Sequence, residues 1–341
     1  MELNLLEKSI LATIAYYDVM DYPLTGFEVF KYLMNPKHIA SLSKLNPDSE
    51  IEPFKTINLI DVLRTLNAST LKQYIDQENG FYFLKEFTPP KAGRDLYRLR
   101  IERQKISDEL WKKSIKIIKW IQIVPFIKMV LMNGSMAIHN AKKESDIDLL
   151  IVVKNKRIWL TRFLITAFFQ ITGRRRHGKK VANRFCLNHY IADNNLKIST
   201  ASLRIAYLAH LVPVLELEQG IYNRFQFENR WAGNYLYFYN LEKLDNRQKI
   251  KNNNFLKSIR RFQEIILNTF IGTILEKIFK FFQIAHIKRS KLLNQEGGRI
   301  IFNDTQLEFH PDSPQSKILH KYNHNLKSLG LDIQEEDTEF S

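Results

Sequence analysis

Two aspartates, Asp146 and Asp148, stand two residues apart in the stretch "SDIDLLIVV". The apolar residues around them predict a buried strand, and alternate side chains of a strand lie on the same face. The two carboxylates therefore project together, where they repel each other unless a cation lies between them. Mg²⁺ prefers such hard oxygen ligands and completes its shell with substrate phosphates. The pair thus predicts a divalent metal site.

A Gly-Ser pair, Gly134 and Ser135, precedes the aspartates and follows the apolar run "FIKMVLMN". Glycine lets the backbone approach a ligand closely, and a serine at the start of a short helix offers a hydroxyl to a phosphate. A phosphate cradle beside a metal-binding acidic pair favours phosphoryl or nucleotidyl transfer.

The same residues resemble the signature of nucleotidyltransferases of the DNA polymerase beta-like superfamily. The eleven-residue step from Ser135 to Asp146 fits that signature, as does Ser145 directly before the pair, and the resemblance covers about residues 126–192. It implies Mg²⁺-dependent transfer of a nucleoside monophosphate from a nucleoside triphosphate, with ATP expected first, to an acceptor hydroxyl. It also implies that Asp146 and Asp148 hold one or two Mg²⁺ ions, while Gly134, Ser135 and Ser145 contact the nucleotide.

The family pattern calls for a third carboxylate on a later strand, and the strand expected here is "RFCLNHYIAD". Asn188 takes the expected catalytic place, and Asp193 at the end of the strand is a substitute. An amide coordinates through its carbonyl oxygen but cannot act as a base. Two interpretations therefore stay open, a working nucleotidyltransferase and a catalytically degenerate regulator that senses nucleotide.

The elements around this motif predict an α+β fold with a mixed sheet in its core. Apolar periodicity before residue 94 gives three helices, and "ENG" then divides two short apolar runs as in a hairpin. That order is typical of a winged helix. The expected division of the chain is a winged-helix-like domain at 1–93, a linking helix at 94–124, a nucleotidyltransferase core at 125–198, a helical substrate or packing domain at 199–295 and a C-terminal extension at 296–341.

A winged helix would support a different class of function, since such modules often place their third helix in the DNA major groove. Here that helix is "INLIDVLRTLN", which offers Arg64, Thr65 and Asn67 to bases. This is a thin set for reading sequence, so docking to a partner protein is an equal alternative to binding nucleic acid.

Composition adds weaker constraints. The formal net charge of +15 is compatible with an anionic acceptor, and the single cysteine, Cys186, excludes an internal disulfide and fits a reducing cytoplasm. The N-terminal residues lack the pattern of a signal peptide. The apolar stretch 262–288 is interrupted by charges, so we expect no transmembrane segment there, but either a packed helix or an interfacial membrane helix.

Two other stretches invite functional interpretations. The basic loop "GRRRHGKK", residues 173–180, lacks the final hydroxyl residue of a phosphate-binding loop and follows a helix. Its arginines, Arg174, Arg175 and Arg176, either contact acceptor or triphosphate or form a solvated charge run. The aromatic segment 220–231 either contacts a nucleobase or packs in the core.

Overall fold

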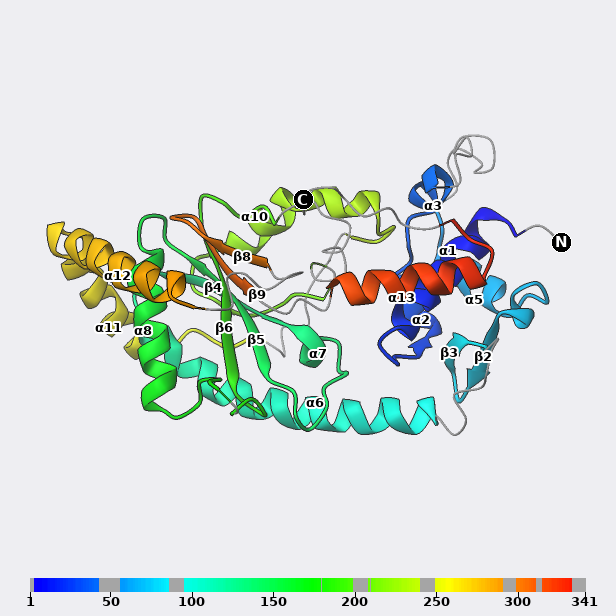
Figure 1. Ribbon diagram of the computed structural model, residues 1–341, viewed down its shortest axis with the longest axis horizontal. Coiled ribbons are helices and arrows are strands. Elements are labelled where there is room, and N and C mark those ends of the chain that lie inside the picture. Colours follow the sequence, from blue (N-terminus) through cyan, green and yellow to red (C-terminus); the bar gives the residue numbers. More distant parts are fainter. Residues whose placement is uncertain are drawn as a thin grey trace.

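The computed structural model describes residues 3–42, 56–85, 95–178, 180–198, 208, 210–239, 249–290, 299–310 and 315–332. A group of short helices with a small sheet lies at one end of the elongated molecule, and a larger sheet with its helices forms the rest (Figure 1). The long helix α6 (Leu96–Ile118) runs beneath both parts. The boundary expected between residues 93 and 94 lies outside the described residues.

Among its described residues, the N-terminal part contains the predicted three helices and hairpin, together with two further short helical segments. Asn4, Thr25 and Asn58 each cap a helix and share a reciprocal hydrogen bond with the acid three residues later. Asn79 and Gly80, both at positive φ, close the predicted hairpin. The elements are α1 (Leu5–Asp18), β1 (Leu24–Thr25), α2 (Gly26–Lys31), α3 (Pro36–Leu42), α5 (Leu59–Leu66), η1 (Leu71–Gln73), β2 (Ile75–Glu78) and β3 (Phe81–Leu84).

These strands form an antiparallel sheet in the order β1-β3-β2. The first helix lies at the centre of this part, since most of its residues are buried. The winged-helix assignment itself stays a prediction.

The larger sheet has six strands in the order β7-β4-β5-β6-β9-β8. Only β5 and β6 pair in parallel, so the sheet is mixed, as expected from the sequence. Its strands are β4 (Ile127–Asn133), β5 (Ile147–Val153), β6 (Phe185–Ala192), β7 (Val212–Glu216), β8 (Arg299–Phe302) and β9 (Gln306–His310).

The first three of these strands were predicted, whereas β7 lies in a stretch whose pattern favoured helices. It is a short apolar run, "VPVLE", that pairs with β4 at the sheet edge. The strands β8 and β9 come from the C-terminal stretch of mixed character and extend the same sheet beyond β6.

Each face of the sheet carries its own core. Alternate residues of β4 enter opposite cores, with Val130 and Met132 facing α6 and α8 (Ile158–Ile171), and Met129 and Leu131 facing the other side. That second side is covered by α10 (Ile221–Glu228) and η4 (Arg230–Asn234). Since α10 buries most of its apolar side chains there, the aromatic segment 220–231 packs mainly in the core.

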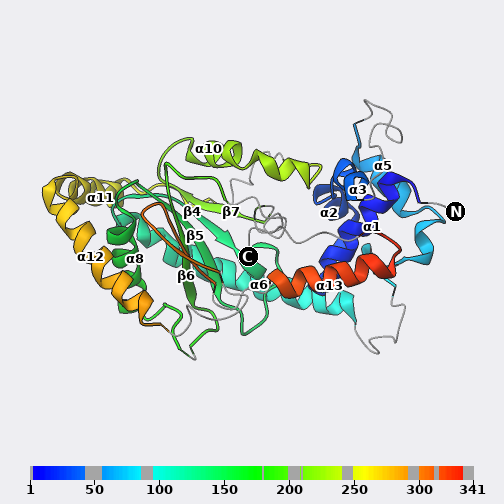
Figure 2. The same ribbon diagram turned by 45° about the horizontal axis from the view of Figure 1, so that its top comes forward.

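Three further helices follow within the described part of the chain. The helices α11 (Asn254–Leu267) and α12 (Phe270–Lys288) form a hairpin at the end of the molecule opposite the N-terminal part, as both views show (Figures 1 and 2). Helix α13 (Gln315–Ser328) returns to the N-terminal part, where Leu326 is buried and Asn325 donates a hydrogen bond to the carbonyl of Ala15. None of the helices within the described ranges is long and apolar enough to cross a membrane.

Candidate metal and nucleotide site

The site begins where β4 ends and the chain turns at Gly134. Asn133 lies opposite Asp148 in the antiparallel pair of β4 and β5, so the turn passes directly over that carboxylate. Gly134 has φ +71°, and a Cβ added to it would lie only 2.5 Å from Oδ2 of Asp148. The position therefore requires glycine twice, for its backbone conformation and for the space that Asp148 occupies.

The two aspartates project from the start of β5 as the strand alternation predicts. Asp146 directly precedes the strand and Asp148 is its second residue, whereas Ile147 and Leu149 are buried in the core on the opposite face. Asp148 lies opposite Cys186 in the parallel pair of β5 and β6. Ligand atoms of Asp146, Asp148 and Cys186 all lie within 4.8 Å of one another.

This crowding changes the acidity of the cluster. Burial and, to a smaller extent, the neighbouring Asp146 carboxylate together raise the pKa of Asp148 to about 7, against the lowering effects of a hydrogen bond with Cys186 and of Arg176. Burial also raises the pKa of the Cys186 thiol, so this side chain is neutral at physiological pH. A carboxyl group whose ionised form is disfavoured by burial and by a like charge is stabilised by a bound cation.

A cation from the chain itself partly meets this need. Nη1 of Arg176 lies 2.5 Å from Oδ2 of Asp146 and donates to the Cys186 sulfur at 3.6 Å. The Asp146 carboxylate raises the pKa of the guanidinium, against the opposing effect of burial. A backbone hydrogen bond from Arg176 to Phe185 holds the basic loop against the start of β6. Arg176 therefore contacts the acidic cluster, although its side chain is exposed, as that of Arg174 is.

The two serines of the motif also lie together. The Ser135 hydroxyl donates to the Ser145 hydroxyl at 3.3 Å, and the Ser145 hydroxyl accepts from the backbone N–H of Lys142 at 2.9 Å. The loop between β4 and β5 therefore brings both hydroxyls to the same end of the sheet as the aspartates.

The two side chains considered for the third catalytic place, Asn188 and Asp193, have hydrogen-bond partners outside the acidic cluster. A register irregularity in β6 follows Cys186, and the Asn188 amide is hydrogen-bonded with Nδ1 of His310 at 3.2 Å. Asp193 follows the last residue of β6 and accepts from the backbone of Asn155, at the opposite end of the parallel strands from Asp146. Asp193 as a substitute third carboxylate was therefore wrong, because β5 and β6 run in the same direction.

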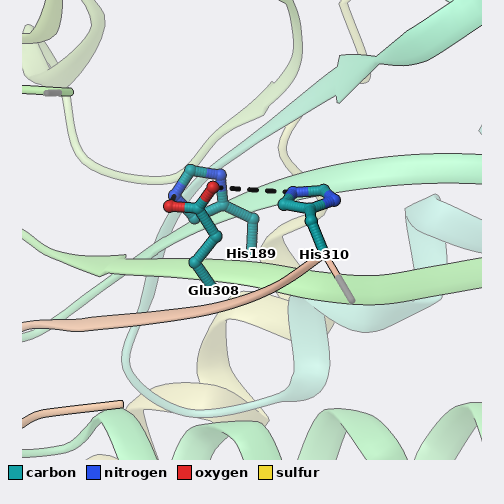
Figure 3. A group of neighbouring side chains, drawn as sticks. All are labelled: His189, Glu308 and His310. Atoms are coloured by element: carbon teal, nitrogen blue, oxygen red, sulfur yellow. Dashed lines mark ion pairs between the residues drawn. The ribbon is translucent and has the colours of Figure 1, made fainter. Parts of the chain in front are cut away.

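A second polar cluster, which the sequence pattern did not reveal, lies on β6 and β9. His189, Glu308 and His310 point toward one another, as Figure 3 shows, and offer ligand atoms within 4.8 Å of one another. Two imidazoles and a carboxylate suit a transition metal. Here, however, Oε2 of Glu308 already accepts hydrogen bonds from the Arg299 side chain at 3.3 Å and from the Gln306 side chain at 3.0 Å. The acidic pair, with its oxygen ligands, is the better candidate for Mg²⁺.

Comparison with known families agrees with this geometry. Residues 111–228 match the family model described as "Nucleotidyltransferase domain". This part of the chain is thus similar to a nucleotidyltransferase domain. The match covers about a third of the chain and includes β4, β5, β6 and β7, hence every residue of the acidic cluster. No curated protein and no solved structure matches the chain.

A nucleotidyltransferase domain implies transfer of a nucleoside monophosphate from a nucleoside triphosphate, and enzymes of this kind generally use Mg²⁺. The strand β7, which the sequence pattern did not predict, is part of the matched region. A short apolar run flanked by polar residues was the available signal for it, although such runs do not distinguish strand from helix by periodicity.

Proposed function

We propose that this chain is a Mg²⁺-dependent nucleotidyltransferase that moves a nucleoside monophosphate, first of all AMP from ATP, to an acceptor hydroxyl. The observation that carries the proposal is the convergence of Asp146 and Asp148 beneath the backbone of Gly134, within the matched domain. The acceptor is a small molecule, a protein side chain or an RNA end, and the net charge of +15 favours an anionic one.

The residues of the cluster fit the metal. Two carboxylates at the start of one strand supply hard oxygen ligands, and the raised pKa of Asp148 reflects a carboxyl group that ionises more easily beside a cation. Arg176, which pairs with Asp146, shows that the cluster accepts positive charge. When bound, the metal would neutralise charge on the triphosphate and on the attacking oxygen.

The remaining residues would position the nucleotide. Gly134 exposes its backbone beside the carboxylates, and Ser135 and Ser145 offer hydroxyls for phosphate oxygens. Transfer of this type depends mainly on positioning and on stabilising charge, with little covalent work for the protein. Arg176 is placed to turn from Asp146 to a phosphate once the aspartates bind metal.

One observation favours the alternative function, a nucleotide-sensing regulator. Cys186 is the side chain opposite Asp148, and it is a neutral thiol with a raised pKa. A neutral thiol cannot take the acceptor proton as a carboxylate does, and neither can the amide of Asn188. In that case the winged-helix-like part would bind DNA or a partner protein in response to nucleotide.

Label transfer separates the two functions. The purified chain would be incubated with Mg²⁺ and each α-labelled nucleoside triphosphate, alone and with cell extract, beside an Asp146→Asn/Asp148→Asn variant. The proposed enzyme releases pyrophosphate and labels an acceptor, and the double variant does neither. Mg²⁺-dependent nucleotide binding without transfer would support the regulator. Nucleotide binding unchanged in the double variant would refute the site.

A further inference from the structure

The helical hairpin α11–α12 carries an apolar surface that faces solvent. Both helices lie wholly within the described residues, and ten of their large apolar side chains are exposed by two-fifths or more. The most exposed are Phe255 and Phe270, each at 73%, and Phe281 at 70%. The ten are Phe255, Phe262, Ile265, Ile266, Phe270, Ile271, Ile274, Ile278, Phe281 and Phe282.

This surface is additional to the face by which the hairpin packs on the domain. Phe279 stacks on Phe163 of α8 with ring centroids 3.9 Å apart, and Ile287 is buried in the core. The exposed Phe270, Ile274 and Phe281 recur at helical spacing along a separate stripe. A helix that is apolar on its inner and its outer sides is normally covered on both.

The hairpin has a well-defined turn. Only Asn268 and Thr269 separate the two helices, and the Thr269 side chain caps α12. Gly272 is buried, and a Cβ added to it would overlap the carbonyl oxygen of Leu267. The two apolar stripes are therefore held side by side, at the end of the molecule farthest from the N-terminal part (Figures 1 and 2).

The charges of the hairpin divide between its two sides. Its two acids face the protein: Glu264 accepts from the backbone of Phe126, and Glu276 accepts from the backbone N–H groups of Trp159 and Leu160. Exposed charged residues on these helices are instead basic. They are Arg261, Lys277, Lys288 and, at the end of α12, Arg289.

We propose that the α11–α12 hairpin binds the surface of an anionic lipid bilayer, with its exposed phenylalanine and isoleucine side chains in the interface. Apolar side chains flanked by lysine and arginine, with the acids turned away, match the amphipathic helices that lie in a headgroup layer. A second copy of the same surface would instead bring like charges together. The inference does not depend on the nucleotidyltransferase chemistry.

The test uses the full chain and sedimentation with phosphatidylcholine vesicles, with and without about 30% phosphatidylglycerol. We expect binding to the anionic vesicles at about 0.15 M salt, and weaker binding to the neutral ones. Phe262→Ser/Phe270→Ser/Phe281→Ser should weaken binding by about a thousandfold, because each buried aromatic side chain contributes about tenfold. Phe227→Ser is the matched control, since Phe227 is 63% exposed on α10, and it should bind as the wild type does.

A charge variant gives an independent readout. Arg261→Gln/Lys277→Gln/Lys288→Gln should lose about a hundredfold on anionic vesicles and little on neutral ones, because each basic side chain contributes about 1 kcal/mol at an anionic surface. Lys112→Gln/Lys113→Gln/Lys116→Gln, on exposed positions of α6, should change neither affinity. Circular dichroism would check that every variant keeps its fold. Absence of wild-type binding to anionic vesicles, or retained binding in the triple Phe variant, would overturn the proposal. A dimer that the Phe variant disperses, without vesicle binding, would assign the surface to a second copy instead.

Discussion

Replacing Gly134 by alanine should damage the site far more than the fold. The new Cβ would lie 2.5 Å from Oδ2 of Asp148, whereas ordinary contact begins at 3.4 Å, so the oxygen would have to move by roughly 0.9 Å. The carboxylate is the end of a flexible side chain and can yield. A misplacement of about 1 Å in a reacting centre costs about a hundredfold in rate. The positive φ adds about 1–2 kcal/mol of strain to the folded state.

Gly330→Ala provides the matched control, because Gly330 has φ +68° and no atom within 4 Å of an added Cβ. Both variants should lose about 1–2 kcal/mol of unfolding free energy in urea titrations. Only Gly134→Ala should lose about a hundredfold in label transfer and bind Mg²⁺-ATP more weakly by calorimetry. Equal activity in the two variants would refute the argument that Gly134 makes room for Asp148.

Three further predictions concern charged side chains, two at the acidic cluster and one on α12. The pKa of Asp148 in the folded protein, about 7, lies above the ordinary value of 3.8. In metal-free buffer, the contribution of Asp148 to the free energy of unfolding is therefore fully present below pH 3.8 and is lost as the pH rises to 7. Asp148→Asn should remove that loss, at most about 4 kcal/mol in urea titrations, and an unchanged pH dependence would contradict the assignment. In spin-resonance titrations without nucleotide, Arg176→Gln should raise the affinity of the protein for Mn²⁺ several-fold, because the variant removes the cation that competes for Asp146. Weaker Mn²⁺ binding would show that Arg176 supports the site. Glu276→Gln should lower the free energy of unfolding by about 1–2 kcal/mol, because Glu276 accepts hydrogen bonds from two backbone N–H groups at the start of α8. The control Lys277→Gln, at an exposed position, should change it by less than about 0.5 kcal/mol.

The local parts of the fold followed from local signals. Asn79-Gly80 between two short apolar runs predicted a hairpin, and β4 and β5 were predicted from their apolar runs. The alternation that placed Asp146 and Asp148 together depends only on strand geometry, so it could be predicted without knowing any neighbouring strand.

Contacts between distant segments could not be predicted in the same way. Which residue of β6 lies opposite Asp148 depends on the register of the parallel pair, and the irregularity after Cys186 moves Asn188 toward His310. The pairing of Arg176 with Asp146 depends on how the basic loop folds back on β6. The strands β8 and β9 join the sheet from more than a hundred residues beyond β6, with no local sign of their partner.

The most direct test of the central claim compares two labels in one reaction. ATP labelled at the α-phosphorus or at the γ-phosphorus would be incubated with the full chain, Mg²⁺ and cell extract. We expect the α label to enter an acceptor while the γ label leaves as pyrophosphate, and Asp146→Asn/Asp148→Asn to abolish both. Transfer of the γ label to the acceptor, or transfer of the α label that survives in the double variant, would contradict it.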